Sequence, residues 1–396
     1  MKQYLKRYAK NFDYPLFFTV DFLSLFGLVM IYSSSIMTAL ADGEDPDHYY
    51  KRQLFNLFVA SLLFLGAAFF PYKHYSRKGF MIFGLGILIT LFLWLVFGGF
   101  GKDTVGSQSW ISIFGLMNFQ PSEYAKLFII LYFSAAFYRK GLKTPIQNLQ
   151  PNEIIYPIII WLIIIGFVGN ETDLGAVAII SGIAISVLLA SGIRFKIFLK
   201  FFTVLIVFGS ILFGLILLVN DDILTDNRLG RLKAFLNPFE YESGSGHQII
   251  NGYIAIGSGG LKGLGLGQSI QKLGYLPEPQ TDFIMAIVVE ELGLLGVIIV
   301  LGGLGFIVIR GLIIALSAKD PFARMIAAGI ASWVAIQTIV NIGGLTGIMP
   351  LTGVTLPFIS YGGTSVILLS LAMGILVNVS MFVKMEKRKS IKGEIE

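Results

Sequence analysis

Long runs of apolar residues alternate with short polar segments along most of this chain. A helix needs roughly 20 apolar residues to cross the hydrocarbon core of a membrane. The pattern therefore predicts an all-α, polytopic membrane protein with about ten transmembrane helices. The predicted spans are 14–37, 53–71, 79–98, 121–138, 154–169, 174–192, 198–219, 284–309, 325–343 and 364–383.

The distribution of charge gives these spans an orientation. If the N-terminus lies in the cytoplasm, the inner segments hold most of the 30 Lys and Arg residues, as the positive-inside rule requires. The first outer loop, 41–50, is instead acidic. An even number of spans returns the basic tail, 384–396, to the cytoplasm. We therefore predict a multi-pass membrane protein with both termini in the cytoplasm.

The composition agrees with lipid as the solvent. Hydrophobic residues make up 55% of the chain and charged residues 14%, against about 45–50% and about 25% in soluble domains. The net charge of +6 then follows from topology and does not indicate nucleic-acid binding. The absence of Cys excludes a thiol nucleophile and thiolate metal sites, and the three His residues have no metal-ligand spacing.

One outer connection, 220–283, is much longer than the others and lies between the seventh and eighth predicted helices of a single domain, 1–396. Structureless connections of this length are usually functional or disordered. Its glycine run, 257–267, predicts tight turns, because it lacks the Gly-Lys-Ser/Thr of a phosphate-binding loop. Loop solubility and capture of a phosphate or pyrophosphate both explain its cations, which are Arg228, Arg231, Lys233, Lys262 and Lys272.

The segment 276–283, Leu-Pro-Glu-Pro-Gln-Thr-Asp-Phe, ends where an apolar helix begins near Ile284. This places Asp282 at the boundary between water and lipid. Thr281 or Asp282 could cap the free N–H groups of that helix. Alternatively, Asp282 could act as a general base or cation ligand beside a membrane-bound substrate.

Other charges lie within or next to predicted spans, where they are costly and often functional. The pair 290–291, Glu-Glu, could bond to polar groups on neighbouring helices. Glu123 and Lys126 share a helix face and predict either an ion pair or a substrate-binding cavity. Asp173 could cap a helix or bind a ligand. Asp21, within the first span, has no evident role.

Several stretches in the same order resemble the SEDS family (FtsW/RodA/SpoVE) over nearly the whole chain. The residues in these stretches are closer to the FtsW type, of cell division, than to the RodA type, of rod elongation. The stretches are Gln120–Glu123 with Lys126; Asp173–Gly175; Arg231 with Asn237–Phe239; Gly244–Gly246; Ala255–Gly260 with Gly263, Gly265, Gly267 and Ser269; Pro277–Glu278 with Thr281–Phe283 and Glu290–Glu291; and Leu356–Gly363.

The resemblance implies a peptidoglycan glycosyltransferase that joins lipid II units outside the plasma membrane during cell division, at the septum. The family's essential aspartate maps onto Asp282, which we expect to be catalytic by deprotonating the GlcNAc 4-hydroxyl of the acceptor. Ser109 stands where many relatives carry Arg before the Trp-Ile pair. The residues expected to bind substrate are Lys102, Gln120, Glu123, Lys126, Asp173, Arg231, Glu278, Thr281, Ser360 and Tyr361.

The resemblance also implies partners: lipid II, a class B penicillin-binding protein acting as transpeptidase, other division proteins and membrane lipid. A divalent cation, Mg or Mn, is the one candidate cofactor. Three other functions remain open. Buried Glu123, Lys126 and Glu290 would also suit a lipid II flippase. The chain could be an elongation-type or sporulation polymerase, or a scaffold that only recruits division proteins.

Overall fold

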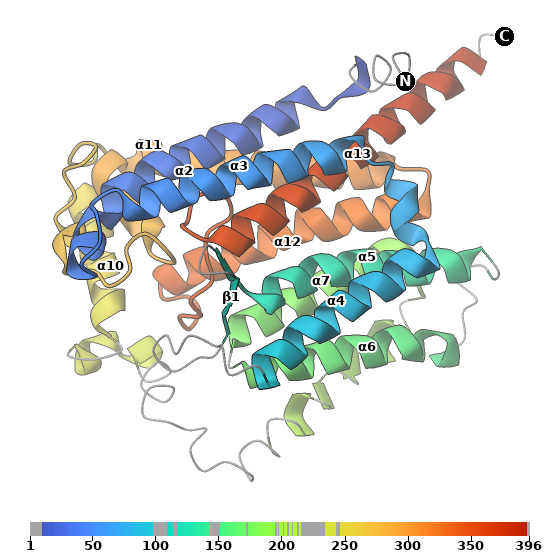
Figure 1. Cartoon of the computed structure of the whole chain (residues 1–396), viewed down its shortest axis with the longest axis horizontal. Helices are drawn as coiled ribbons and strands as arrows, with labels where there is room; N and C mark the ends of the chain where they lie inside the picture. The colour runs from blue at the N-terminus through green and yellow to red at the C-terminus, as the bar shows by residue number, and fades with distance from the viewer. Residues whose placement is uncertain are drawn as a thin grey trace.

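The computed structural model is a bundle of long helices that run nearly side by side (Figure 1). It describes residues 10–97, 109–113, 117–142, 144, 151–171, 173–194, 234–242 and 246–393, together with scattered positions between 196 and 214. Lys102, Arg228, Arg231 and Lys233, four of the cations singled out in the sequence, lie outside the described residues.

Nine of the ten predicted spans are helices in the part of the chain that the structure describes. Of the seventh, 198–219, each described position between 196 and 214 is helical. Among the described residues, seven helices are long and apolar enough to cross a membrane, which confirms the all-α polytopic fold. The nine are α2 (Tyr14–Ala41), α3 (His48–Phe69), α4 (Lys78–Phe97), α5 (Pro121–Gly141), α6 (Pro151–Asn170), α7 (Leu174–Ser191), α11 (Ile284–Ser317), α12 (Pro321–Leu345) and α13 (Gly363–Gly393).

The connections contain short elements of their own. The outer loop before α5 forms a two-stranded antiparallel hairpin in which Ser112 lies opposite Asn118. The long connection holds a helix, so the expectation of a structureless segment is wrong for its described part. The short elements are η1 (Tyr72–Ser76), β1 (Ile111–Ile113), β2 (Met117–Phe119), η4 (Pro238–Tyr241), α10 (His247–Gly259) and η5 (Gln271–Leu273).

Of the glycine run 257–267, the first three residues end α10, while the rest forms the predicted tight turns and is joined to the backbone of α11. The amide of Gly265 donates to the carbonyl of Glu291 at 2.9 Å. Gly263 and Gly293 have φ of +73° and +59° and lie so close that a Cβ on either would overlap the other's backbone. Gly293 also interrupts the helical geometry of α11. Only glycine adopts such angles and permits this approach without strain.

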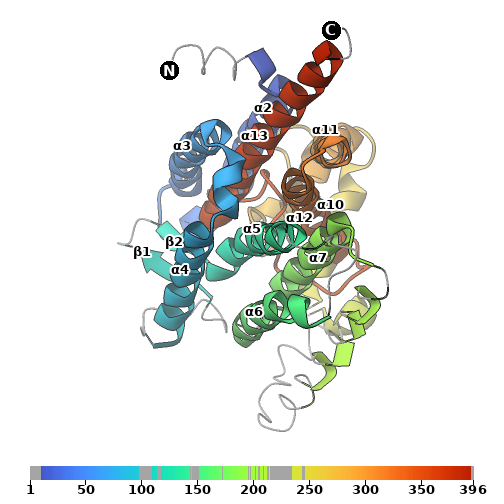
Figure 2. The ribbon, with the colours of Figure 1, turned by 90° about the vertical axis from the view of Figure 1, so that its right-hand side faces the viewer.

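The two ends of the described chain meet at one end of the bundle, and α10 lies at the opposite end (Figure 1). Asp13, just before α2, is fully buried and bonds to Arg310 of α11 at 3.1 Å and to Lys384 of α13 at 3.2 Å. This common end agrees with an even number of spans. Viewed along the bundle, α5, α12 and α13 are surrounded by the other helices (Figure 2).

The segment between α12 and α13, residues 346–362, folds back into the bundle, and we call it the re-entrant loop. Its residues Phe358 and Ile359 are buried. They pack on α2 at Gly27, where an added Cβ would lie 2.6 Å from the Phe358 carbonyl oxygen. The absence of a side chain at Gly27 therefore leaves room for a non-helical segment among the helices. Non-helical backbone is tolerated at membrane depth where protein encloses it.

We expect Gly27→Ala to displace the re-entrant loop, because the clash is with backbone that cannot rotate away. The substitution should lower the thermal unfolding midpoint of the purified protein by several degrees, the usual result of overpacking by about 1–3 kcal/mol. Gly66→Ala in α3 is the matched control, since nothing lies within 4 Å of its added Cβ. Equal midpoints for the two variants would show that the loop does not depend on this contact.

Candidate active site

Asp282 lies half-buried in the turn that leads into α11. The hydroxyl Oγ1 of Thr281 is 3.1 Å from Asp282 Oδ1 and 3.2 Å from Glu278 Oε2, so two carboxylates converge on one hydroxyl. The capping interpretation is wrong, because the N-cap of α11 is Phe283 and no side chain caps that helix. The Asp282 carboxylate is therefore not engaged in helix capping.

The backbone of this turn is fixed by α12 and the re-entrant loop. Asn341 Nδ2 donates to the Asp282 carbonyl at 2.8 Å and to the Val354 carbonyl at 2.7 Å. The Tyr361 amide donates to the Gln280 carbonyl at 2.8 Å, and the Ser360 hydroxyl donates to the Thr281 carbonyl. The turn is thus held in a single position relative to these two segments of the fold.

Two residues near this turn have positive φ angles, which residues other than glycine rarely adopt. Glu278 has φ of +45° and Phe358, in the re-entrant loop, has φ of +63°. Such conformations cost on the order of 1–3 kcal/mol each and cluster at functional sites. Their presence on the two facing segments supports a site between them.

A second group of polar residues surrounds the start of α5. Glu123 Oε1 and Lys126 Nζ are 2.7 Å apart, and their side chains are only 8% and 2% exposed. Lys126 also donates to Gln337 Oε1 at 3.3 Å and lies over the Trp333 ring. The predicted ion pair is confirmed, and it is enclosed by protein.

Gln120 and Asp173 belong to the same group. Gln120 Nε2 donates to Asp173 Oδ2 at 3.2 Å. Asp173 Oδ1 accepts from the Ala176 amide at 2.8 Å, so the capping interpretation of Asp173 is confirmed. The backbone N–H of Gln120 donates to the Thr364 hydroxyl at the start of α13. The structure therefore brings together two predicted site residues that are 53 positions apart.

Two amides of α12 connect the second group to Asp282, and the sequence analysis missed both. Gln337 Nε2 donates to the Thr355 carbonyl of the re-entrant loop at 2.9 Å, while its oxygen accepts from Lys126. Asn341, one turn further along, holds Asp282. Amides four residues apart share one helix face. Two amide side chains on one face of an apolar helix are a sequence signal that could have identified both residues.

Arg52, near the start of α3, is a further residue that was not selected from the sequence. Its guanidinium lies close enough to the Tyr361 hydroxyl to interact with it. The Tyr361 ring also meets the Tyr49 ring edge-on, with centroids 5.0 Å apart. The structure thus places an exposed cation next to the segment that holds the Asp282 turn.

The glutamates of α11 and one predicted anion-binding cation have structural partners. Lys272 Nζ is 2.7 Å from Glu291 Oε1 and 2.9 Å from Ser33 Oγ, and Lys272 is buried. Assigning Lys272 to phosphate capture is therefore wrong, because this ion pair occupies its charge. Glu290 accepts from Ser258, Ser269 and the Ile270 amide. Pairing of both glutamates within the fold is confirmed.

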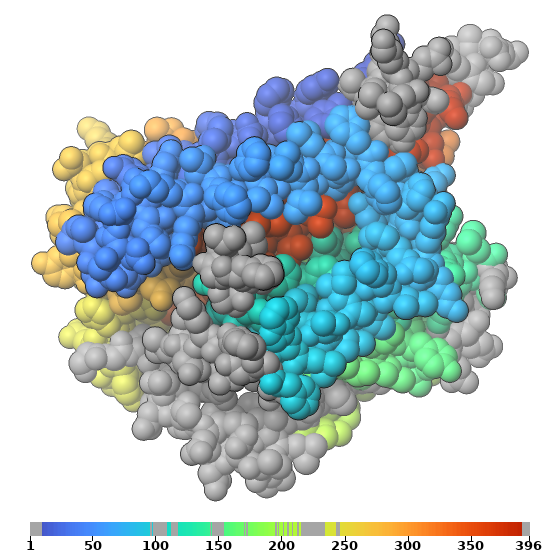
Figure 3. Space-filling model, viewed as in Figure 1, coloured from blue at the N-terminus to red at the C-terminus, as the bar shows by residue number. Residues whose placement is uncertain are grey.

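An apolar groove of about 380 Å³ runs beside the second group. It lies between α3 and α4, and α13 is visible at its floor (Figure 3). From α5 it is lined by Tyr124, Leu127, Phe128 and Leu131, whereas Glu123 and Lys126 of the same helix bond toward α12. The groove is therefore separated from the polar group by the width of one helix.

The described residues contain no group of three or more His, Cys, Asp or Glu side chains that could hold a metal ion. Asp282 and Glu278 supply only two carboxylates, which meet at Thr281. Mg²⁺ is often held by one or two carboxylates together with substrate phosphates. These two residues therefore fit a cation that arrives with a phosphorylated substrate.

Glu171, in the turn before Asp173, is a buried acid, and neither carboxylate oxygen has a hydrogen-bond partner among the residues that the structure describes. Burial raises the pKa of Glu171 to about 9. The pKa of this carboxyl is therefore higher in the folded chain than in the unfolded chain. Its contribution to the stability of the folded state is complete below the unfolded pKa and is lost as the pH rises toward the folded pKa. At pH 8 the unfolded chain ionises this group and the folded chain does not.

We therefore expect Glu171→Gln to raise the unfolding midpoint at pH 8 by several degrees, while the two proteins unfold at similar temperatures near pH 4.5. The measurement is a thermal melt of both purified proteins across this pH range. Glu240→Gln, an exposed outer carboxyl, should show no pH-dependent difference. A constant difference at every pH would exclude ionisation of Glu171 as the cause.

Comparisons with known proteins match nearly the whole length of the chain. The family profile described as "Cell cycle protein" (FTSW_RODA_SPOVE) matches residues 14–385. The "Probable peptidoglycan glycosyltransferase FtsW" of Bacillus subtilis (strain 168) is 45% identical over 98% of this chain and 95% of its own length. "Stage V sporulation protein E" of the same organism is 37% identical over 90% of this chain and 93% of its own.

Solved structures share the fold. A chain from a peptidoglycan synthase complex, described for its coordination of polymerization and crosslinking, superposes with a TM-score of 0.72 at 23% identity, covering 94% of this chain and 98% of that one. The Rod shape determining protein RodA of Thermus thermophilus gives a TM-score of 0.63 at 23% identity, covering 93% and 96%.

Proposed function

Since this chain belongs to the FtsW/RodA/SpoVE family of cell cycle proteins, we propose that it polymerises lipid II into glycan strands at the outer face of the plasma membrane. It is a multi-pass membrane protein and a peptidoglycan glycosyltransferase. The observation that carries the catalytic proposal is the Asp282 turn. Its carboxylate does not cap α11, and its backbone is held by Asn341, Ser360 and Tyr361.

The reaction needs one base and one stabilised leaving group. Asp282 takes the proton of the acceptor GlcNAc 4-hydroxyl. That oxygen attacks the anomeric carbon of the donor MurNAc, a new C–O bond forms, and the bond from this carbon to pyrophosphate breaks. Undecaprenyl pyrophosphate leaves with the electron pair. The Thr281 hydroxyl, 3.1 Å from Asp282 Oδ1, orients the base.

The polyprenyl tails cannot leave the bilayer, so the site must offer an apolar surface next to its polar one. The groove between α3 and α4 provides this surface beside α5. Its lining is predominantly apolar, as for most sites that bind hydrophobic ligands. We assign the groove to a tail of the substrate.

The developing charge on pyrophosphate requires a cation. Arg52 is the described candidate, because it is exposed beside Tyr361 and Arg can contact phosphate oxygens in a bidentate manner. Lys126 is engaged by Glu123 and Gln337. A divalent cation held by Asp282 and Glu278 would supply Lewis-acid stabilisation of the pyrophosphate oxygens. Loss of polymerisation in chelator, restored by Mg²⁺ or Mn²⁺, tests this addition.

The proposal extends to the cellular setting. Both termini lie in the cytoplasm, the protein acts at the division septum, and a class B penicillin-binding protein cross-links its product. The high identity to an FtsW favours division over elongation. The match to a chain of a peptidoglycan synthase complex supports a transpeptidase partner.

Reconstitution separates polymerisation from transport. Purified protein in liposomes, with its partner transpeptidase and lipid II supplied only on the outside, should produce polymer detectable on a gel. A flippase would move fluorescent lipid II across the bilayer without polymer. Transport is the weaker hypothesis, because Glu290 and Lys126 are each bonded within the fold. Translocation without polymer would reverse this assignment.

A further inference from the structure

Asp21 is an acidic residue inside a membrane-spanning helix, and nothing in the proposed reaction uses it. It is exposed on α2 and has no hydrogen-bond or ion-pair partner among the residues that the structure describes. At a rise of 1.5 Å per residue it lies about 10 Å from the inner end of α2. A carboxylate at that depth is costly, and such residues face a partner or a functional cavity.

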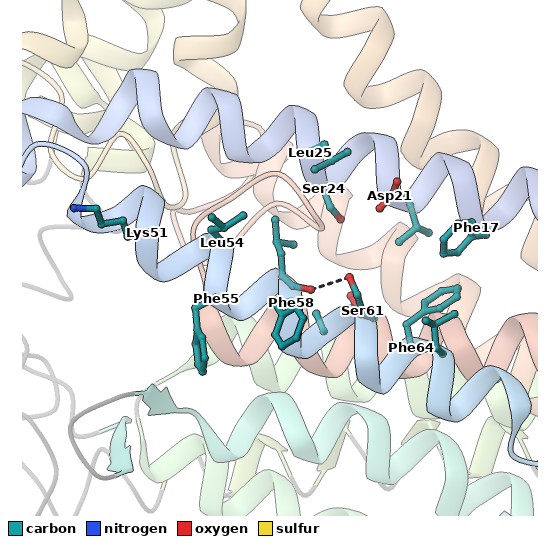
Figure 4. Close-up of a pocket in the computed structure, with 15 residues that line it drawn as sticks. Phe17, Asp21, Ser24, Leu25, Lys51, Leu54, Phe55, Phe58, Ser61 and Phe64 are labelled. Carbon is teal, nitrogen blue, oxygen red and sulfur yellow. Dashed lines mark hydrogen bonds between the residues drawn. The ribbon is translucent and has the colours of Figure 1, made fainter.

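Asp21 opens into a groove of about 610 Å³ between α2 and α3, on the other side of α3 from the proposed tail groove. Figure 4 shows Asp21 and Ser24 on α2 and Ser61 on α3 along this groove. We call this feature the α2–α3 groove. Most of its other lining residues are large and apolar, including Phe17, Leu25, Leu54, Phe55, Phe58 and Leu65.

The α2–α3 groove has the features of a seat for a helix. Its lining residues on α3 recur at intervals of three and four, at Leu54, Phe58, Ser61 and Leu65, which is one helix face. Small residues interrupt the apolar walls at Ser24, Ala60, Ser61 and Ser370. Small residues let helix backbones approach closely in membranes, where packing and hydrogen bonds drive association.

We propose that the α2–α3 groove binds a transmembrane helix of another protein that carries a Lys or Arg opposite Asp21. The nearest described cation in the groove, Lys51, does not serve Asp21, because its Nζ is paired with Asp47 at 2.8 Å. An acyl chain of a lipid has no cation or hydrogen-bond donor at this depth. A twofold contact between copies of this chain would set one Asp21 against the other.

The chain contains no Cys, so cross-linking chemistry can be placed at single chosen positions. A photo-reactive amino acid at Leu25, in the groove, should yield one discrete protein adduct in membranes of the cells that normally make this protein. The same probe at Phe83, exposed on α4, is the positional control. The cross-linked peptide, sequenced by mass spectrometry, should be a transmembrane segment with a basic residue.

The charge is tested by substitution. Asp21→Lys and Asp21→Asn should each reduce the Leu25 adduct at least tenfold, whereas Phe22→Ala, on the exposed side of α2 outside the groove, should not. Changing the identified basic residue to Asp should restore the adduct with Asp21→Lys. Immunoblots of the membranes check that each variant is present in equal amounts. If the lysine variant fails to insert into the membrane, the isosteric Asp21→Asn variant still provides the test.

The possible results divide cleanly. An adduct with lipid alone, with a second copy of this chain, or with a helix that lacks a basic residue would overturn the proposal, as would an adduct insensitive to Asp21 or the absence of any adduct. Since the readout is a cross-link, it does not depend on whether the chain polymerises lipid II.

Discussion

Asp282→Ala is expected to lower the rate of lipid II polymerisation by about 10²–10⁴-fold, the usual effect of removing a positioned base. The fold should persist, because the contacts that fix the turn are made by the backbone carbonyls of Thr281 and Asp282. The measurement is the initial rate of polymer formation by purified protein with its partner present, together with a thermal melt of the same samples.

Two further variants sharpen this test. Asp282→Asn keeps the shape and removes the base, so it should be as inactive as Asp282→Ala. Asp45→Ala removes an exposed outer carboxylate of the α2–α3 connection and should leave the rate unchanged. Near-normal turnover in Asp282→Asn would exclude this residue as the base, and another outer carboxylate, first Glu278, would become the candidate.

Lys126→Ala is expected to be the most destabilising substitution among the predicted site residues. It would leave the Glu123 carboxylate buried without its cation, and Glu123 Oε2 already has no hydrogen-bond partner within the described part of the chain. Breaking a buried ion pair from one side costs about 3–5 kcal/mol. We expect poor recovery of the purified protein and a clearly lower unfolding midpoint.

The matched control is the exposed ion pair between Asp47 and Lys51, which has nearly the same length, 2.8 Å. Lys51→Ala should leave the unfolding midpoint nearly unchanged, because water screens this exposed pair. The double variant Glu123→Gln with Lys126→Met should recover most of the stability. A similar loss in Lys126→Ala and Lys51→Ala would mean that burial does not set the importance of the α5 pair.

The positions of the helices were predictable because crossing lipid imposes a length and a composition that each segment must meet by itself. The start of α11 at Ile284 and of α5 at Pro121 agree with the predicted spans within a few residues. Local chemistry was predictable for the same reason, as with the pairing of Glu123 and Lys126, which needs only one turn of helix.

The assembly of the site depended on contacts between distant segments. Asn341 holds Asp282 across 59 positions, and Lys272 bonds to Ser33 across 239. No periodicity records such pairs. The cap assigned to Thr281 or Asp282 was wrong, since the last turn of the loop is set by Asn341, Ser360 and Tyr361, which a local pattern cannot include.

The sequence by itself determined that this is a membrane protein of about ten spans with an acidic residue at the start of its eighth predicted helix, because hydropathy and charge act on each segment separately. Only the tertiary structure decided which charges are engaged. It showed that Lys272 is held by Glu291, that Arg52 reaches Tyr361, and that Asp21 faces an open groove. These outcomes depend on which side chains packing brings within hydrogen-bond distance, about 3 Å.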